Sequence, residues 1–194
     1  GFESSTAENT TLENGAVSIA QRIIVRAEKK TKTYGDALTS ADLTFTISDS
    51  ERAKLLPGDT VESLGLTLKA TTIEPEDILT GSTTDADGDD ILGAYGNAGR
   101  YVILKDNATN TNYDVVVLPA FLNVSPKEAE IEWNAAAQYT YTGNACGIEA
   151  NVKADSLLEK DSCAIKKLLN ADHTEVGNYK ALAIGLTNEN YIFS

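Results

Sequence analysis

An internal similarity between the two halves of the chain constrains its fold more than any other feature. Three blocks recur in the same order, at offsets of about 107, of 102 and of 78 residues: YGDA (34–37) with YTGNA (141–145), LLPGDTV (55–61) with LLEKDSC (157–163), and GRY…NY (99–113) with GNY…NY (177–191). Three ordered matches within 194 residues indicate two related modules in tandem.

The spacing between blocks places an insertion in the first module. Val61 and Gly99 are 38 positions apart, whereas the aligned Cys163 and Gly177 are only 14 apart. The first module therefore carries about 24 extra residues, roughly Thr71 to Tyr95. This stretch is acidic and rich in turn-forming residues, and we predict an inserted loop or hairpin.

The same alignment sets the predicted boundaries. Residues 1–20 resemble the tail of a preceding module with a final strand near Gly15–Ile19, because AVSIAQRIIV is similar to FLNVSPKEAEIEW. Module one spans 21–126 and module two spans 127–194. Module two stops where the counterpart of Leu118–Val124 would begin, so we expect it to lack its last strand. Either another chain fills that position by β-augmentation or the module tolerates the loss. The leading Gly1 and the absence of Met indicate a piece of a longer protein.

Short runs of β-branched and aromatic residues between turn residues predict strands. Leu43, Phe45 and Ile47 alternate with polar residues, which is the pattern of a half-buried strand. Only Ser50–Leu56 and Ala154–Lys160 read as short helices. We predict a mostly β chain of two tandem small modules, either β-grasp-like or an immunoglobulin-like sandwich, each with at most one short helix.

Several of these motifs resemble a known family. TKTYGD (31–36), the PGDT turn (57–60), the GRY strand start, NYDV and FLNVSP are similar to the YG-type MBG repeat modules of large bacterial surface proteins. Module two, with YTYTGNA, VGNYKALA and LTNENY, resembles a shorter relative of that family. The resemblance implies an extracellular or surface-anchored, non-enzymatic array that serves as stalk, spacer or adhesin.

Composition excludes several partners and activities. The net charge of −13 argues against nucleic acid and anionic membranes, since phosphate binding needs a basic surface. No apolar run approaches the roughly 20 residues that span a bilayer. Motifs for a nucleophile elbow, a zinc protease or a phosphate loop are missing. His173 is the only histidine of the sequence, and it lies in a polar run. We therefore predict no enzyme.

One acidic cluster suggests a metal. Asp85, Asp87, Asp89 and Asp90 surround Gly88, and alternating carboxylates around a glycine turn are the ligands that Ca²⁺ prefers. The glycine comes one position early for a calcium loop, and no bidentate glutamate follows. The alternative is a solvated acidic loop. No other cofactor is predicted.

The remaining distinctive residues lie mostly in module two. Cys146 and Cys163 are 17 residues apart and form either a disulfide, which would suit an extracellular compartment, or two buried thiols. Trp133 is expected in the core or between modules, with a sugar-stacking platform as the alternative. Tyr101 and Tyr179 are expected to bury their rings between sheets while their hydroxyls reach the backbone.

These observations predict a structural role. The chain is expected to be a spacer module of a bacterial surface or secreted protein, with neighbouring modules as its partners. The alternative is an adhesin module that binds a host glycan, mucin or protein, which an exposed aromatic patch would favour.

Overall fold

The computed structural model describes residues 19–73, 81–134 and 138–194. The predicted tail strand Gly15–Ile19 therefore lies outside the described residues, apart from Ile19. In module one the elements are β1 (Gln21–Ala27), β2 (Lys30–Thr33), η1 (Ser40–Asp42), β3 (Phe45–Thr46), α1 (Asp49–Arg52), η2 (Glu62–Leu64), β4 (Leu66–Thr71), β5 (Gly99–Ala108), β6 (Tyr113–Leu118) and β7 (Ala120–Ser125). In module two they are β8 (Lys127–Ala129), β9 (Ile131–Asn134), β10 (Cys146–Gly147), β11 (Glu149–Val152), η3 (Ala154–Ser156), β12 (Ile165–Leu169), β13 (Asp172–His173), β14 (Leu182–Leu186) and β15 (Tyr191–Phe193).

Module one is a sandwich of two sheets. One sheet has the order β3-β1-β6 and the other has the order β2-β7-β5-β4. The pairs β1–β6 and β2–β7 are parallel, and the other pairs are antiparallel. Every second residue of β1 is buried from Ile23 onward, so one face of this strand is packed. Ala27 of β1 packs in one core cluster with Leu122 of β7, which joins the two sheets.

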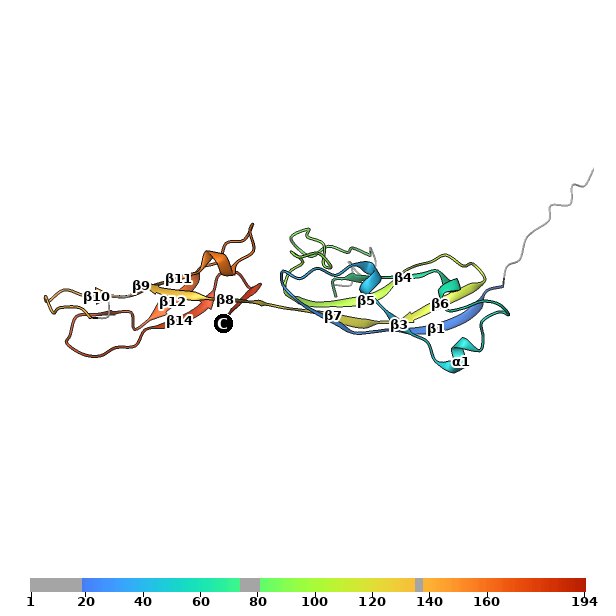
Figure 1. Ribbon diagram of the computed structural model, residues 1–194, viewed down its shortest axis with the longest axis horizontal. Helices are drawn as coiled ribbons and strands as arrows, with labels where there is room; N and C mark the ends of the chain where they lie inside the picture. The colour runs from blue at the N-terminus through green and yellow to red at the C-terminus, as the bar shows by residue number, and fades with distance from the viewer. Residues whose placement is uncertain (1–18, 74–80, 135–137) are drawn as a thin grey trace, which may run out of the picture.

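Module two repeats part of this pairing. Its β8 lies parallel to β15, as β1 does to β6, while β9 pairs with β11 and β12 with β14 in antiparallel fashion. Among the described residues no strand pair crosses from one module to the other. Figure 1 shows the two modules end to end along the long axis, joined where β7 leads into β8.

The mostly β fold of small modules is confirmed, and the sandwich is the form that it takes. A β-grasp fold needs a helix packed across a sheet, but α1 has four residues and none of them is buried. Ser48 caps α1, since its Oγ accepts from the amide of Glu51 at 3.3 Å. The helix predicted at Ala154–Lys160 was wrong beyond η3, because Leu157 already has an extended backbone.

The insertion packs on module one. The part that the structure describes from Gly81 onward has an antiparallel bridge between Thr84 and Asp90. Ile91 is fully buried and joins the core cluster that contains Ile103. Burying an isoleucine side chain stabilises a fold by about 1.5–3 kcal/mol, so this loop is held by its apolar residues.

Candidate functional site: the joint between the modules

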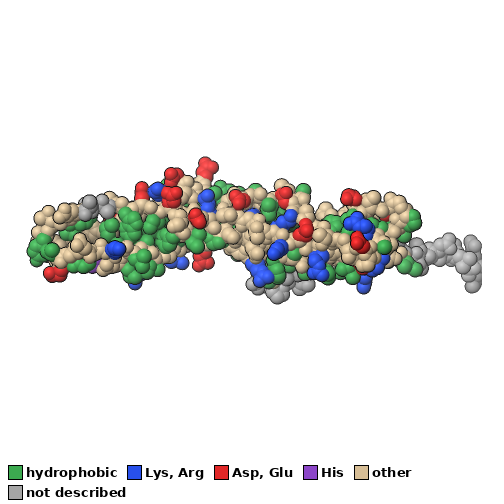
Figure 2. Space-filling view, turned by 60° about the horizontal axis from the view of Figure 1, so that its bottom comes forward, with side chains coloured by type: hydrophobic (Ala, Val, Ile, Leu, Met, Phe, Trp, Pro, Cys, Tyr) green, Lys and Arg blue, Asp and Glu red, His purple; other side chains and the backbone are tan. Residues whose placement is uncertain are grey.

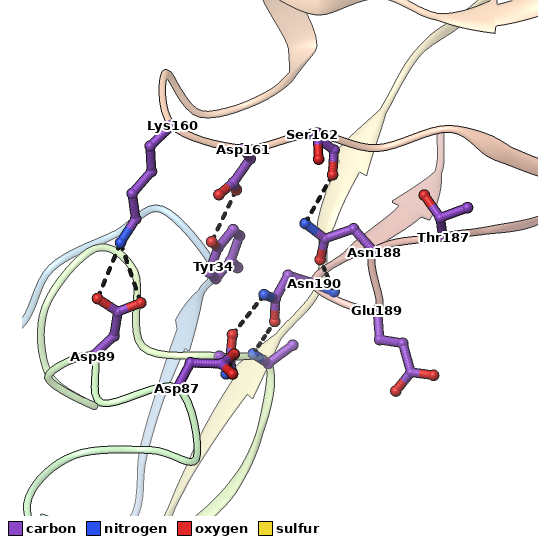
Figure 3. Close-up of a pocket in the computed structure, with 12 residues that line it drawn as sticks. Tyr34, Asp87, Asp89, Lys160, Asp161, Ser162, Thr187, Asn188, Glu189 and Asn190 are labelled. Atoms are coloured by element: carbon purple, nitrogen blue, oxygen red, sulfur yellow. Dashed lines mark hydrogen bonds and ion pairs between the residues drawn. The ribbon is translucent and has the colours of Figure 1, made fainter.

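The joint forms where the turn after β2 meets module two. The Tyr34 hydroxyl donates to Oδ2 of Asp161 at 2.9 Å, and the Tyr191 hydroxyl donates to the same oxygen at 2.7 Å. The two rings meet edge to face, with centroids 5.6 Å apart. Figure 3 shows Tyr34 reaching across to Asp161. One carboxylate thus holds a tyrosine from each module.

Leu158 brings the two backbones close at this point. Its amide donates to the Tyr191 hydroxyl at 2.8 Å, and its side chain lies 3.1 Å from the position of a Cβ on Gly35. Gly35 has φ of +100°, a conformation that favours glycine. A larger residue at Gly35 would therefore be strained and would also crowd Leu158.

The same tyrosine arrangement occurs at the far end of module one. The Tyr113 hydroxyl donates to Asp59 at 2.6 Å and accepts from the amide of Leu56 at 2.8 Å. These three residues align with Tyr191, Asp161 and Leu158 at the offsets of 78 and 102 found in the sequence. The aligned segments therefore have the same local structure.

Asp85 organises the insertion from inside. Its side chain is buried, and its carboxylate accepts from the amides of Asp87 at 3.1 Å, Asp89 at 3.0 Å and Asn97 at 2.7 Å. An amide that is shielded from water and left without an acceptor costs about 1–3 kcal/mol. Asp85 thereby fixes the positions of the residues on either side of it.

Lys32 of β2 fastens the insertion to module one. Its buried ammonium group donates to the carbonyl oxygens of Gly93 and of Asp36, the latter at 3.1 Å. Burial lowers the pKa of Lys32, and the carboxylates of Asp90, Asp36 and Asp85 oppose this shift. The amide of Gly35 also donates to the carbonyl of Ala94 at 2.9 Å.

The insertion and the residues that lead from it into β5 contact module two at two points. Asn190 accepts from the amide of Ala98 at 2.7 Å and donates from Nδ2 to Oδ1 of Asn97, also at 2.7 Å. Lys160 pairs with Asp89 at 3.0 Å, and its ammonium group lies 3.9 Å from the centroid of the Tyr95 ring. Both partners of the ion pair are well exposed, so it contributes about 1 kcal/mol at most. The hydrogen bonds of Asn190 are the more shielded contact.

Burial at the joint alters the ionisation of its tyrosines. Desolvation, followed by the hydrogen bond to Asp161, raises the pKa of Tyr34. Desolvation likewise raises the pKa of Tyr191, against the opposing effect of the Leu158 amide. Both hydroxyls are protonated at neutral pH, and the protonated form is the one that donates hydrogen bonds to Asp161.

The four candidate calcium ligands have separate partners. Asp85 binds backbone amides, Asp87 accepts from Asn97 Nδ2 at 2.8 Å, Asp89 pairs with Lys160, and Asp90 accepts from the amide of Leu92 at 3.0 Å. In the described part of the chain, no group of three or more His, Cys, Asp or Glu is arranged to hold a metal ion. The calcium hypothesis remains a prediction for experiment.

Cys146 and Cys163 are both free thiols in the structure. Cys163 packs against the core cluster at the joint, whereas Cys146 lies on β10, opposite His173 of β13. His173 stacks on Tyr179 with ring centroids 3.4 Å apart. The histidine is thus part of a packed aromatic pair.

Module two exposes aromatic side chains. Trp133 lies on β9 and is exposed, in contrast to the expected core position. Tyr139, Tyr141 and Tyr179 are exposed as well. Figure 2 shows hydrophobic side chains gathered over module two.

Sequence reasoning missed the residues that join the modules. The pairing of Asn190 with Asn97 and of Lys160 with Asp89 links positions 93 and 71 residues apart. Nothing in either local pattern indicates a partner so distant. The alignment did mark Asp161, Asn190 and Tyr191, which match Asp59, Asn112 and Tyr113, but it did not indicate their partners across the joint.

Comparison of the chain with protein-family models, with curated proteins and with solved structures finds no match. Within the described residues, no helix is long and apolar enough to cross a membrane. The resemblance to YG-type MBG modules therefore depends on the motifs alone.

Proposed function

We propose that this chain is a non-catalytic structural segment, a stiff spacer in a bacterial surface or secreted protein. The observation that carries the proposal is the joint, where hydrogen bonds of Asp161 and Asn190 and the contacts of the insertion connect the two modules. Two modules linked only by Pro126 would change their relative orientation freely. Additional contacts on separate elements restrict bending and twisting of one module against the other. The matching hydrogen bonds of Tyr113 and Tyr191 support an array built from repeated units.

Stiffness can be tested with residual dipolar couplings measured in solution. We expect the alignment tensors fitted separately to residues 21–125 and 138–194 to agree in magnitude and orientation. Asn190→Ala removes two hydrogen bonds at the joint, so the two tensors should diverge. Asn112→Ala, the aligned change away from the joint, is the matched control and should leave them in agreement. Divergent tensors in the unmodified protein would refute the stiff spacer.

The exposed aromatic residues favour adhesion as a second candidate function. Trp133, Tyr139 and Tyr141 offer flat apolar faces of the kind that stack on sugar rings. A glycan and mucin binding screen, run beside an unrelated acidic protein, tests this role. Binding that Trp133→Ala abolishes without loss of folding would support it, and an empty screen would reject glycan and mucin adhesion.

A further inference from the structure

A cavity lies in module two, away from the joint. Its volume is about 710 Å³, and its walls come from strands β9 to β13 and from Tyr139, which follows β9 in the chain. Figure 1 shows β9 and β10 toward the end of module two that is remote from module one. Small-ligand sites in proteins typically have volumes of about 300–1,000 Å³, so the cavity is large enough for a ligand of several rings.

One wall of the cavity is formed by a cross-strand pair. Asn134 of β9 lies directly opposite Glu149 of β11, and residues paired in this way project from the same face of a ladder. Trp133 lies opposite Ala150 and therefore projects from the other face. The cavity is thus lined by Asn134 and Glu149, and the exposed tryptophan belongs to a different surface.

The facing wall carries a second carboxylate, that of Asp172. Asn170 has φ of +56° and turns the chain after β12, so that Asp172 of β13 comes to lie opposite Gly147 of β10. The amide of Ile148 donates to the carbonyl of Ala171 at 3.0 Å and fixes this approach. A Cβ on Gly147 would overlap Oδ1 of Asp172, so the glycine provides the space that the carboxylate occupies.

A tyrosine forms the aromatic part of the cavity. Tyr139 is 49 % exposed, and its hydroxyl donates to the carbonyl oxygen of Gly147 at 2.6 Å. The ring is therefore held at its far end against β10. Ile148 and Leu168 add apolar side chains to the lining. An aromatic ring beside aliphatic groups matches the C–H faces of sugar rings, which are apolar while their rims are polar.

The polar side chains of the cavity have unused hydrogen-bonding capacity. Within the part of the chain that the structure describes, the side chains of Asn134, Glu149 and Asp172 make no hydrogen bond or ion pair to protein atoms. An amide both donates and accepts, and a carboxylate accepts from hydroxyl groups. Neighbouring hydroxyls on a sugar ring offer donors and acceptors of this kind side by side.

We propose that this cavity binds a short neutral oligosaccharide, with the ring of Tyr139 against a sugar face and with Asn134, Glu149 and Asp172 hydrogen-bonded to its hydroxyls. The two carboxylates repel acidic sugars, and the net charge of −13 acts in the same direction. The inference rests on the adhesion candidate above, and it assigns that function to one site and one class of sugar.

Isothermal titration calorimetry of the 194-residue chain with maltose, cellobiose and lactose tests the proposal. Each sugar is compared with the uronic acid made by oxidising its terminal hydroxymethyl group. We expect at least one neutral disaccharide to bind, and its acidic counterpart to bind at least about tenfold more weakly. Amide chemical shifts in the presence of the bound disaccharide should change at residues 147–149 and 171–172.

Substitutions within the β9–β11 ladder locate the site. Asn134→Ala and Glu149→Gln should each weaken binding of the neutral sugar about tenfold. Glu149→Gln should also bring the affinities for the neutral and acidic sugars closer together, because it removes one of the repelling charges. The matched controls are Asn151→Ala and Glu132→Gln, since these exposed residues pair with each other farther along the same ladder and do not line the cavity. They should bind like the unmodified chain.

Several outcomes would overturn the proposal. They are the absence of binding by all three neutral disaccharides, shift changes that spare residues 147–149 and 171–172, and equal losses in the controls. Binding that Trp133→Ala abolishes and Asn134→Ala leaves intact would retain adhesion and reject this cavity as its site. The tensor measurement concerns contacts at the joint, so it tests the stiff spacer separately.

Discussion

At the scale of single residues, aligned tyrosines behave differently because their surroundings differ. Both Tyr101 and Tyr179 were predicted to be buried with their hydroxyls on the backbone. The hydroxyl contacts are present for both, but only Tyr101 is buried, so the prediction for the Tyr179 ring was wrong. A side chain's burial depends on the strand opposite it, which the local sequence does not contain.

Tyr101 makes stability depend on pH in the alkaline range. Desolvation, with smaller effects of Asp85 and Asp87, raises the pKa of Tyr101 from 10.0 to about 12. The unfolded chain releases this proton near pH 10 and the folded chain holds it, so the free energy of unfolding falls as pH rises from 10 to about 12. Urea unfolding at several pH values should show a steeper fall for the unmodified protein than for Tyr101→Phe. Parallel curves would contradict the assignment.

At the scale of elements, the stretch predicted as an insertion lies between β4 and β5, and its packing was not foreseen. The predicted limits, Thr71 to Tyr95, lie close to the end of β4 at Thr71 and the start of β5 at Gly99. Counting the residues between aligned blocks is enough to predict these limits. The burial of Ile91 depends instead on the sheet beneath the loop. A composition rich in acids and turn formers does not indicate that Ile91 and Leu92 are buried and hold the loop against this sheet.

Asp85 should be the most sensitive residue of the insertion. In Asp85→Asn, an amide nitrogen replaces one oxygen acceptor and can face the amide of Asn97, so we expect a loss of about 3 kcal/mol in the free energy of unfolding. Asp87→Asn, in the same loop, should cost less than about 1 kcal/mol. Equal losses for the two variants would contradict the role of Asp85.

The calcium hypothesis has its own test. Thermal melts of the unmodified protein are compared in calcium and in chelator, and a higher melting temperature in calcium would support the metal site.

At the scale of the whole molecule, the core of one module continues toward the other. Tyr34 of module one and Tyr191 of module two belong to the same cluster of buried residues, with Leu157 and Leu158 packed against it. The stability of module two therefore depends on a side chain supplied by module one. Trp133 is the one tryptophan of the chain and lies in module two, so its fluorescence follows this module alone.

Denaturant unfolding followed by Trp133 fluorescence should detect the joint. Tyr34→Phe removes the hydrogen bond to Asp161, and we expect the transition of module two to lose about 1 kcal/mol. Tyr113→Phe removes another tyrosine–carboxylate hydrogen bond, the one to Asp59 at the far end of module one, and is the control, which should shift this transition less. A transition unaffected by Tyr34→Phe would show that the two modules are energetically independent.

The amino-acid sequence by itself determined the strand-rich fold of small modules, because alternating patterns and turn residues are local properties. The aligned blocks predicted the module boundaries and the place of the insertion. Only the tertiary structure decided how the modules meet. Asn190 reaches Ala98, Lys160 reaches Asp89, and Asp161 binds tyrosines from both modules. Such contacts join residues far apart in the chain, and each arises from the way two finished sheets and a packed loop lie against one another.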